Sequence, residues 1–172
     1  MTGDDIHNFY KSIKKVDGVF LLDPLCLGNL VEKKGEQLSS SIERLVNKKL
    51  NKNNLVFMPA NQKSLHWSLI VYEKSIKTFH HYDSLGGLNF SLYSPLCEKI
   101  LRNVAATSSF VKKEKTPQQC NGNDCEVYVM AITQFLVNRY KRNTSKMNWE
   151  ISDDEAQEIH KSVREIRKKL SG

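Results

Sequence analysis

The feature that most constrains the fold is the segment CEVYVMAITQFLVNRY (residues 125–140), which is apolar nearly all round. A helix of this kind is usually buried in the core of a protein, because no side of it suits water. Asp124 stands directly before the segment, and aspartate is a favoured N-cap residue. The sequence therefore predicts a buried helix that begins at Cys125 with Asp124 as its cap, and other elements must cover it.

Strands are predicted in the middle of the chain, where short runs are rich in β-branched and aromatic residues. The predicted strands are residues 55–60, 66–75, 76–84 and 108–114. The second and third follow one another almost at once, so a tight reversal near residues 73–75 would pair them as an antiparallel hairpin. Gly86-Gly87 predicts a turn after the hairpin's second strand.

Helices are predicted in the first third of the chain and again after the hairpin. Apolar side chains recur at helical spacing in residues 6–13 and in residues 38–46. The apolar stretch between these two segments is broken by Pro24 and Gly28. Ser94-Pro95 has the pattern of a helix start, with serine as the cap and proline at the first position, and predicts a helix to about residue 105.

The last part of the chain predicts an exposed connector at residues 138–148 and then a final amphipathic helix. Ser152 and Glu155 have the spacing of a capping box, which marks the start of that helix. Together the segments predict an α+β architecture: a small, mostly antiparallel central sheet flanked by helices, with the buried helix beginning at Cys125.

Length and composition favour a single intracellular domain. A chain of 172 residues can bury one core, and it contains no internal repeat and no Pro/Gly-rich linker. No stretch approaches the roughly 20 apolar residues that span a bilayer. The N-terminus, MTGDDIHNFYKSIKK, lacks the apolar core of a signal peptide. We therefore expect a monomer in the cytosol or nucleus, with no membrane partner.

The net charge of +7 raises the question of nucleic-acid binding. The basic residues are spread along the chain, however, and no zinc-finger, homeodomain or RRM signature is present. This distribution favours a solvated surface over nucleic-acid binding, and an acidic protein partner stays open.

The cysteines favour free thiols. Cys26, Cys97, Cys120 and Cys125 form no CxxC pair, and the histidines do not supply the spacing of a tetrahedral zinc site. Disulfides are typical of secreted proteins, for which this sequence shows no signal. We expect neither a metal nor a disulfide framework.

Cys125 has the position that a cysteine nucleophile requires. The first turn of a helix carries unpaired N–H groups and the positive end of the dipole, and both stabilise a thiolate. An imidazole base and an orienting carboxylate complete such a site. His66 begins one predicted strand and Asp83 ends the next, so a hairpin would place them at the same end. Gln119 could donate its amide to a developing oxyanion. Spacing alone leaves the ordinary alternatives open: a small buried thiol and a surface histidine.

Three separated motifs together resemble one family. They are HWSL (residues 66–69), HYDS (residues 81–84) and QCNGNDC (residues 119–125). Their order and local spacing are similar to those of the Ulp/sentrin-specific proteases, the cysteine peptidases that process or remove ubiquitin-like modifiers. The likeness is strongest across residues 54–137 and is greatest to the small deneddylase-like branch.

The resemblance implies a papain-like cysteine protease fold of the Ulp type and a role for each matching residue. Cys125 would be the nucleophile, His66 the general base and acid, Asp83 its orienting partner and Gln119 part of the oxyanion hole. Trp67 would line the tunnel that admits the modifier's Gly-Gly tail, although a core aromatic is an equal reading. The implied partner is the neddylation modifier or SUMO, with ubiquitin as a further candidate, and no cofactor is implied.

The same resemblance implies one Ulp-like protease domain over residues 1–172. Residues 1–53 would form a shortened helical N-terminal part, residues 54–137 the catalytic core, and residues 138–172 the connector and basic C-terminal helix.

Two positions depart from the family pattern. Glu126 follows the cysteine where the family usually has glycine, and the upstream tryptophan that helps to clamp the diglycine tail is absent. Asn29 lies in the corresponding upstream segment, and the resemblance implies a substrate-binding role for it. These departures keep a second class open, a catalytically impaired module that binds a ubiquitin-like protein. A deubiquitinase and a Cys-His-acid acyltransferase are the enzymatic alternatives.

Overall fold

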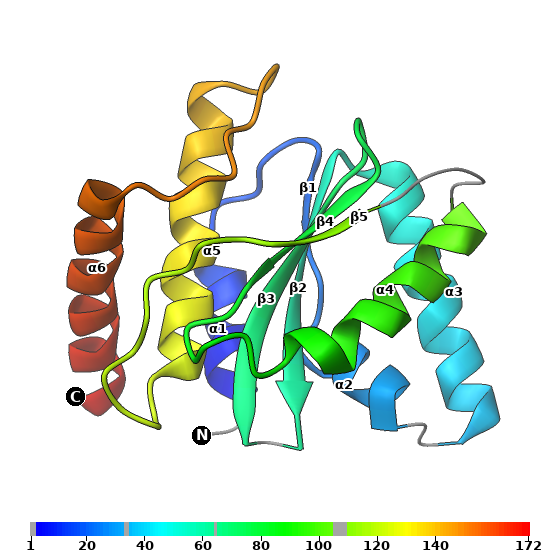
Figure 1. The fold of residues 1–172 in the computed structure, drawn as a ribbon, viewed down its shortest axis with the longest axis horizontal. Helices are drawn as coiled ribbons and strands as arrows, with labels where there is room; N and C mark the ends of the chain where they lie inside the picture. The colour runs from blue at the N-terminus through cyan, green and yellow to red at the C-terminus, as the bar shows by residue number, and fades with distance from the viewer. Residues whose placement is uncertain (1–2, 33–34, 64, 105–109) are drawn as a thin grey trace.

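In the computed structural model, five strands form one mixed sheet between two layers of helices (Figure 1). The structure describes residues 3–32, 35–63, 65–104 and 110–172. The strands lie in sequence order across the sheet: β1 (Val19–Leu21), β2 (Leu55–Gln62), β3 (His66–Glu73), β4 (Thr78–Tyr82) and β5 (Phe110–Lys113). The two central pairings are antiparallel and the two edge pairings are parallel. The long central pairings confirm the α+β prediction of a sheet that is mostly antiparallel.

Three helices lie on each side of the sheet. One layer holds α1 (Asp4–Ser12), α5 (Cys125–Arg142) and α6 (Asp153–Ser171), and the other holds α2 (Leu25–Glu32), α3 (Glu36–Lys52) and α4 (Phe90–Val104). Helix α6 packs on α5 rather than on the sheet. None of the helices in the described ranges has both the length and the apolar content that crossing a bilayer requires.

Alternation along β3 explains how one strand serves both layers. Trp67, Leu69 and Val71 point into the core beneath α5, whereas Ile70 and Tyr72 point into the core beneath the other three helices. All five side chains are buried. A strand covered on both faces carries apolar side chains on both, as β3 does from Leu69 to Tyr72.

Helix α5 confirms the predicted buried helix, but two details of its ends differ from prediction. The helix continues to Arg142, so the exposed connector begins five residues later than residues 138–148 suggested. Asp124 occupies the N-cap position without making a side-chain cap hydrogen bond. Its carboxylate instead accepts from Asn121 Nδ2 at 2.8 Å and pairs with Arg167 of α6, a charged donor that binds a carboxylate more strongly than a backbone N–H does.

The other element predictions hold with shifted boundaries. Helix α4 begins at Phe90, not at Ser94, and so contains Pro95. The turn at Gly86-Gly87, where both residues have positive φ, delivers the chain to this earlier start. The stretch interrupted by Pro24 and Gly28 forms β1 and α2, with Gly28 inside the helix. The strand predicted at residues 108–114 is β5, and residues 108–109 lie outside the described residues.

The hairpin and the capping box are as predicted. Strands β3 and β4 pair antiparallel from Leu69↔Tyr82 to Glu73↔Thr78. At the start of α6, the Ser152 hydroxyl accepts from the Glu155 N–H at 3.2 Å and the Glu155 carboxylate accepts from the Ser152 N–H at 2.8 Å. Both features arise from local sequence rules, which explains why they could be predicted.

Candidate active site

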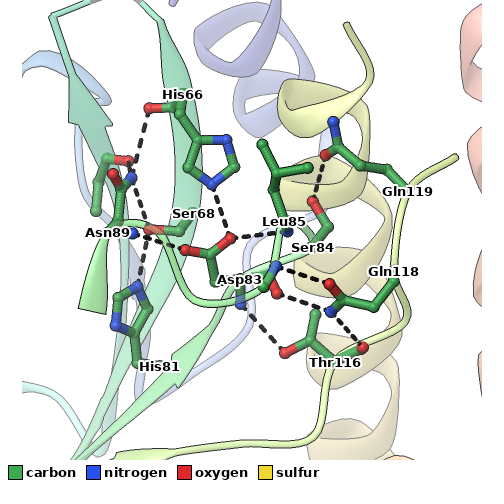
Figure 2. A network of polar contacts seen from close by, with 12 residues as sticks. His66, Ser68, His81, Asp83, Ser84, Leu85, Asn89, Thr116, Gln118 and Gln119 are labelled. Carbon is green, nitrogen blue, oxygen red and sulfur yellow. Dashed lines mark hydrogen bonds and ion pairs between the residues drawn. The ribbon is translucent and has the colours of Figure 1, made fainter. Parts of the chain in front are cut away.

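The β3–β4 hairpin brings His66 and Asp83 together at one end of the sheet. His66 is the first residue of β3, and Asp83 follows the last residue of β4. His66 Nε2 lies 2.7 Å from Asp83 Oδ1, and both side chains are buried (Figure 2). The pairing follows from antiparallel register, which places the start of one strand beside the end of the next.

Asp83 is held by the turn that follows it. Its Oδ1 accepts from the Leu85 N–H and its Oδ2 accepts from the Asn89 N–H, each at 2.9 Å (Figure 2). Burial alone would raise the pKa of Asp83, but the hydrogen bonds from His66, Asn89 and Leu85 outweigh burial and hold the pKa below its usual range. Asp83 is therefore a carboxylate at neutral pH and faces the imidazole with negative charge.

Cys125 completes the group as the first residue of α5. Its side chain is buried, and it lies close enough to His66 to affect the imidazole. Burial by itself would lower the pKa of His66, but the hydrogen bonds and charges of Asp83 and Cys125 raise it to about 9. At neutral pH the His66 imidazole is therefore protonated, and it lies between the Asp83 carboxylate and the Cys125 side chain at the positive end of a long helix.

Gln119 lies in the loop of residues 118–124, which we call the pre-cysteine loop. Its Oε1 accepts from the Ser84 hydroxyl at 2.7 Å, and its own N–H donates to the Ser84 carbonyl at 2.9 Å. Its Nε2 donates to the Asn121 carbonyl at 2.5 Å. The loop is thus joined to the strand end beside Asp83, while the Gln119 amide is engaged within its own loop.

The two predicted substrate-binding residues lie in different layers. Trp67 is 3% exposed and packs in the core beneath α5, where its ring also approaches the N-terminus of α1 at Gly3. Asn29 is half-buried in α2, a helix that packs on β2, α3 and α4. Within the described ranges, no hydrogen bond joins Asn29 to His66, Asp83 or Cys125. The roles of both residues in substrate binding stay predictions.

Several residues that hold the site have no signal in the motifs. Asn89 is fully buried, and its Nδ2 donates to the Ala60 carbonyl at 3.1 Å and to the Ser68 hydroxyl at 3.1 Å. Gln118 Nε2 donates to the Asp83 carbonyl at 3.1 Å, and its Oε1 accepts from the Gly86 N–H at 2.7 Å. The Gly86-Gly87 turn is the only available hint, because it returns the chain toward Asp83.

Glu126, the second residue of α5, is buried where α5 packs against α1. It is 0% exposed, and neither carboxylate oxygen has a hydrogen-bond partner among the described residues. Burial raises the pKa of Glu126 to about 7, and the carboxylates of Asp5 and Asp4 on α1 add to the shift. The charges that act on this side chain are therefore those of α1. The departure from the family pattern is accommodated between α1 and α5.

We expect Glu126→Gln to stabilise the protein at pH 8 and to have little effect at pH 4.5. In the unfolded chain the carboxyl ionises near 4.5, whereas in the folded protein it ionises near 7. The wild-type protein therefore loses stability as the pH rises between these values, by about 3 kcal/mol in total. Urea unfolding at both pH values measures the difference. The exposed Glu158→Gln is the matched control, and an equal effect at both pH values would contradict the account.

Known proteins resemble this chain in sequence. Residues 8–170 match the model of the Ulp1 protease family, C-terminal catalytic domain. NEDD8-specific protease 1 of Arabidopsis thaliana is 34% identical over 96 residues, which cover 51% of this chain and 42% of that protein. Human sentrin-specific protease 8 is 32% identical over 106 residues, covering 56% of this chain and 50% of that protein. The chain thus spans half or less of the length of these relatives.

Solved structures support the fold. The Xanthomonas campestris effector XopD bound to ubiquitin has a TM-score of 0.64 at 15% identity, covering 96% of this chain and 90% of that one. The Ulp1 protease domain in complex with Smt3, the yeast orthologue of SUMO, has a TM-score of 0.54 at 19% identity, covering 98% and 75%. With the family model matched across almost the whole chain, this protein belongs to the Ulp1 protease family.

Proposed function

We propose that this protein is a cysteine protease that cleaves after the C-terminal Gly-Gly of a ubiquitin-like modifier, of the deneddylase or deSUMOylase type. The observation that carries the proposal is the position of His66, which hydrogen-bonds to Asp83 and interacts with Cys125 at the start of α5. A structural histidine needs neither a thiol partner at a helix N-terminus nor a buried carboxylate behind it. A nucleophile, its base and an orienting group need this arrangement.

The proposed reaction starts from the thiolate of Cys125 and the imidazolium of His66. The thiolate attacks the carbonyl carbon of the modifier's last glycine, and the carbonyl oxygen becomes an oxyanion. The backbone N–H of Cys125 stabilises that oxyanion, together with Gln119 once its amide turns from the Asn121 carbonyl. His66 then protonates the leaving amine as the C–N bond breaks.

Hydrolysis of the resulting thioester completes the cycle. His66, now neutral, takes a proton from water as the water attacks the thioester carbonyl. The thiolate leaves and the modifier departs with a free C-terminal carboxylate. Asp83 stabilises the imidazolium in both halves of the reaction and orients the ring, without becoming protonated itself.

The choice of modifier follows from the relatives. The relatives reported above include NEDD8-specific protease 1 and human sentrin-specific protease 8, which favours the neddylation modifier as the first substrate to test. SUMO is the second, because the Ulp1 protease domain forms a complex with Smt3, the yeast orthologue of SUMO. Ubiquitin is the third, because XopD binds it.

A precursor-processing assay tests the proposal. The neddylation modifier, SUMO and ubiquitin, each with a short C-terminal extension, are incubated with the protein, and the products are identified by mass. We expect cleavage directly after Gly-Gly in one of them, and loss of that cleavage when the penultimate glycine is changed to alanine. Cleavage at another bond, or cleavage that tolerates the alanine, would contradict the proposal.

A further inference from the structure

Helix α6 reaches the pre-cysteine loop from the side opposite the sheet. Arg167 Nη2 pairs with Asp124 Oδ2, and Asp124 is the residue directly before the nucleophile. The Asp124 side chain is only 8% exposed, while that of Arg167 is 45% exposed. The nearly buried carboxylate at the N-terminus of α5 is thus paired with a cation from α6.

The Asp124 carboxylate links Arg167 to the rest of the pre-cysteine loop. Asp124 Oδ2 also accepts from Asn121 Nδ2 at 2.8 Å, and the Asn121 carbonyl accepts from Gln119 Nε2 at 2.5 Å. Gln119 Oε1 in turn accepts from Ser84 at the end of the β4 strand. One continuous series of polar contacts therefore runs from α6 to the residue beside Asp83.

A second contact from α6 reinforces the first. His160 Nδ1 lies 2.7 Å from the Tyr128 hydroxyl, and that hydroxyl donates to the Gln118 carbonyl at 3.4 Å. Helix α6 is itself fixed to α5 by the buried side chains of Ile159 and Val163. The pre-cysteine loop is therefore supported at both ends by one firmly packed helix.

We propose that Arg167 is a positioning residue, which acts through Asp124 to hold the pre-cysteine loop beside the Cys125 N–H, in the place from which the Gln119 amide turns into the oxyanion hole. The inference rests on the proposed protease function. Arg167 touches neither His66 nor Asp83 in any described contact, so its effect reaches the chemistry only through the loop. Misplacement of an oxyanion donor by a small distance is costly, because the donor must meet charge that develops in the transition state.

This role predicts a selective defect in Arg167→Met, which keeps the aliphatic stem and removes the charge. We expect kcat to fall about 10-fold, with KM changed by less than about twofold, because the loop stabilises the oxyanion rather than the bound modifier. Alkylation of Cys125 by iodoacetamide forms no oxyanion, so its rate and pH profile should match those of the wild-type protein. Arg167→Lys should recover part of the lost kcat by restoring a cation.

Arg164→Met is the matched control, since Arg164 is an exposed arginine one helical turn earlier on α6. The partner variant Asp124→Asn should lower kcat similarly, and the double variant should be no worse than either single one. Amide exchange should be faster in residues 118–124 of Arg167→Met and unchanged in the middle of α5. This last readout needs no substrate, so it tests the loop contact even if the wild-type protein cleaves none of the three modifiers.

Three results would overturn the inference. One is an unchanged kcat in Arg167→Met beside an active wild-type protein. Another is an equal loss in turnover and in alkylation, which would place the effect on the thiol or on the whole fold. The third is unaltered amide exchange in residues 118–124. Absence of cleavage by the wild-type protein would instead count against the proposed function.

Discussion

Replacing Cys125 with alanine is expected to lower cleavage of the preferred modifier by at least about 10⁴-fold while leaving its binding intact. The proposed acyl intermediate forms on the thiol of Cys125, and alanine lacks that group. Alanine is also small enough to fit the buried first position of α5 without disturbing the helix. Turnover and a binding isotherm for the same modifier measure the two effects separately.

The neighbouring thiol provides the control. Cys120 is exposed, five residues before Cys125, and is the more accessible of the two to solvent. Cys120→Ser should retain most of the turnover, because exposure is not what makes Cys125 the nucleophile. Cleavage that survives in Cys125→Ala, or that is lost in Cys120→Ser, would contradict the assignment.

His66→Ala is expected to cost more than Asp83→Ala. Loss of the imidazole removes both the base and the acid, and we expect a decrease in kcat/KM of about 10⁴-fold. Loss of Asp83 leaves the imidazole in place but less well oriented, and the decrease should be smaller by about tenfold or more. Steady-state kinetics of the two variants against the wild-type protein decide the order.

The pH dependence tests the same pair. The His66 pKa is raised to about 9, so the imidazolium is present below that pH and is lost as the pH rises through it. Turnover by the wild-type protein should therefore fall above about pH 9, and in Asp83→Ala this fall should move to lower pH. An alkaline limb that stays in place without Asp83 would show that this carboxylate does not set the state of the imidazole.

Much of the fold could be predicted because it follows local rules. The hairpin, the capping box at Ser152 and the buried helix at Cys125 each arise from a short sequence pattern. The element ends were less predictable, because tertiary contacts decide them. Helix α4 starts at Phe90 and accepts Pro95 inside, which no capping rule favours.

The sequence pointed to candidate reactive residues, but it carried no signal for the residues that support them. His66, Asp83 and Gln119 stand out because each matches a motif with a chemical reason. Asn89 and Arg167 do not, since their partners lie far away in sequence and only the packed structure brings them together. Asp124 shows the limit most directly: its type suits a helix cap, but a cation from α6 engages its carboxylate instead.

The central claim, that Cys125 attacks the C-terminal glycine of a ubiquitin-like modifier, is tested most directly by intact mass. The protein is mixed with the neddylation modifier, SUMO and ubiquitin, each carrying a thiol-reactive group in place of its C-terminal carboxylate. The account predicts a single covalent adduct with one of them, present in Cys120→Ser and absent in Cys125→Ala. No adduct with any of the three from folded protein, or an adduct that persists in Cys125→Ala, would contradict it.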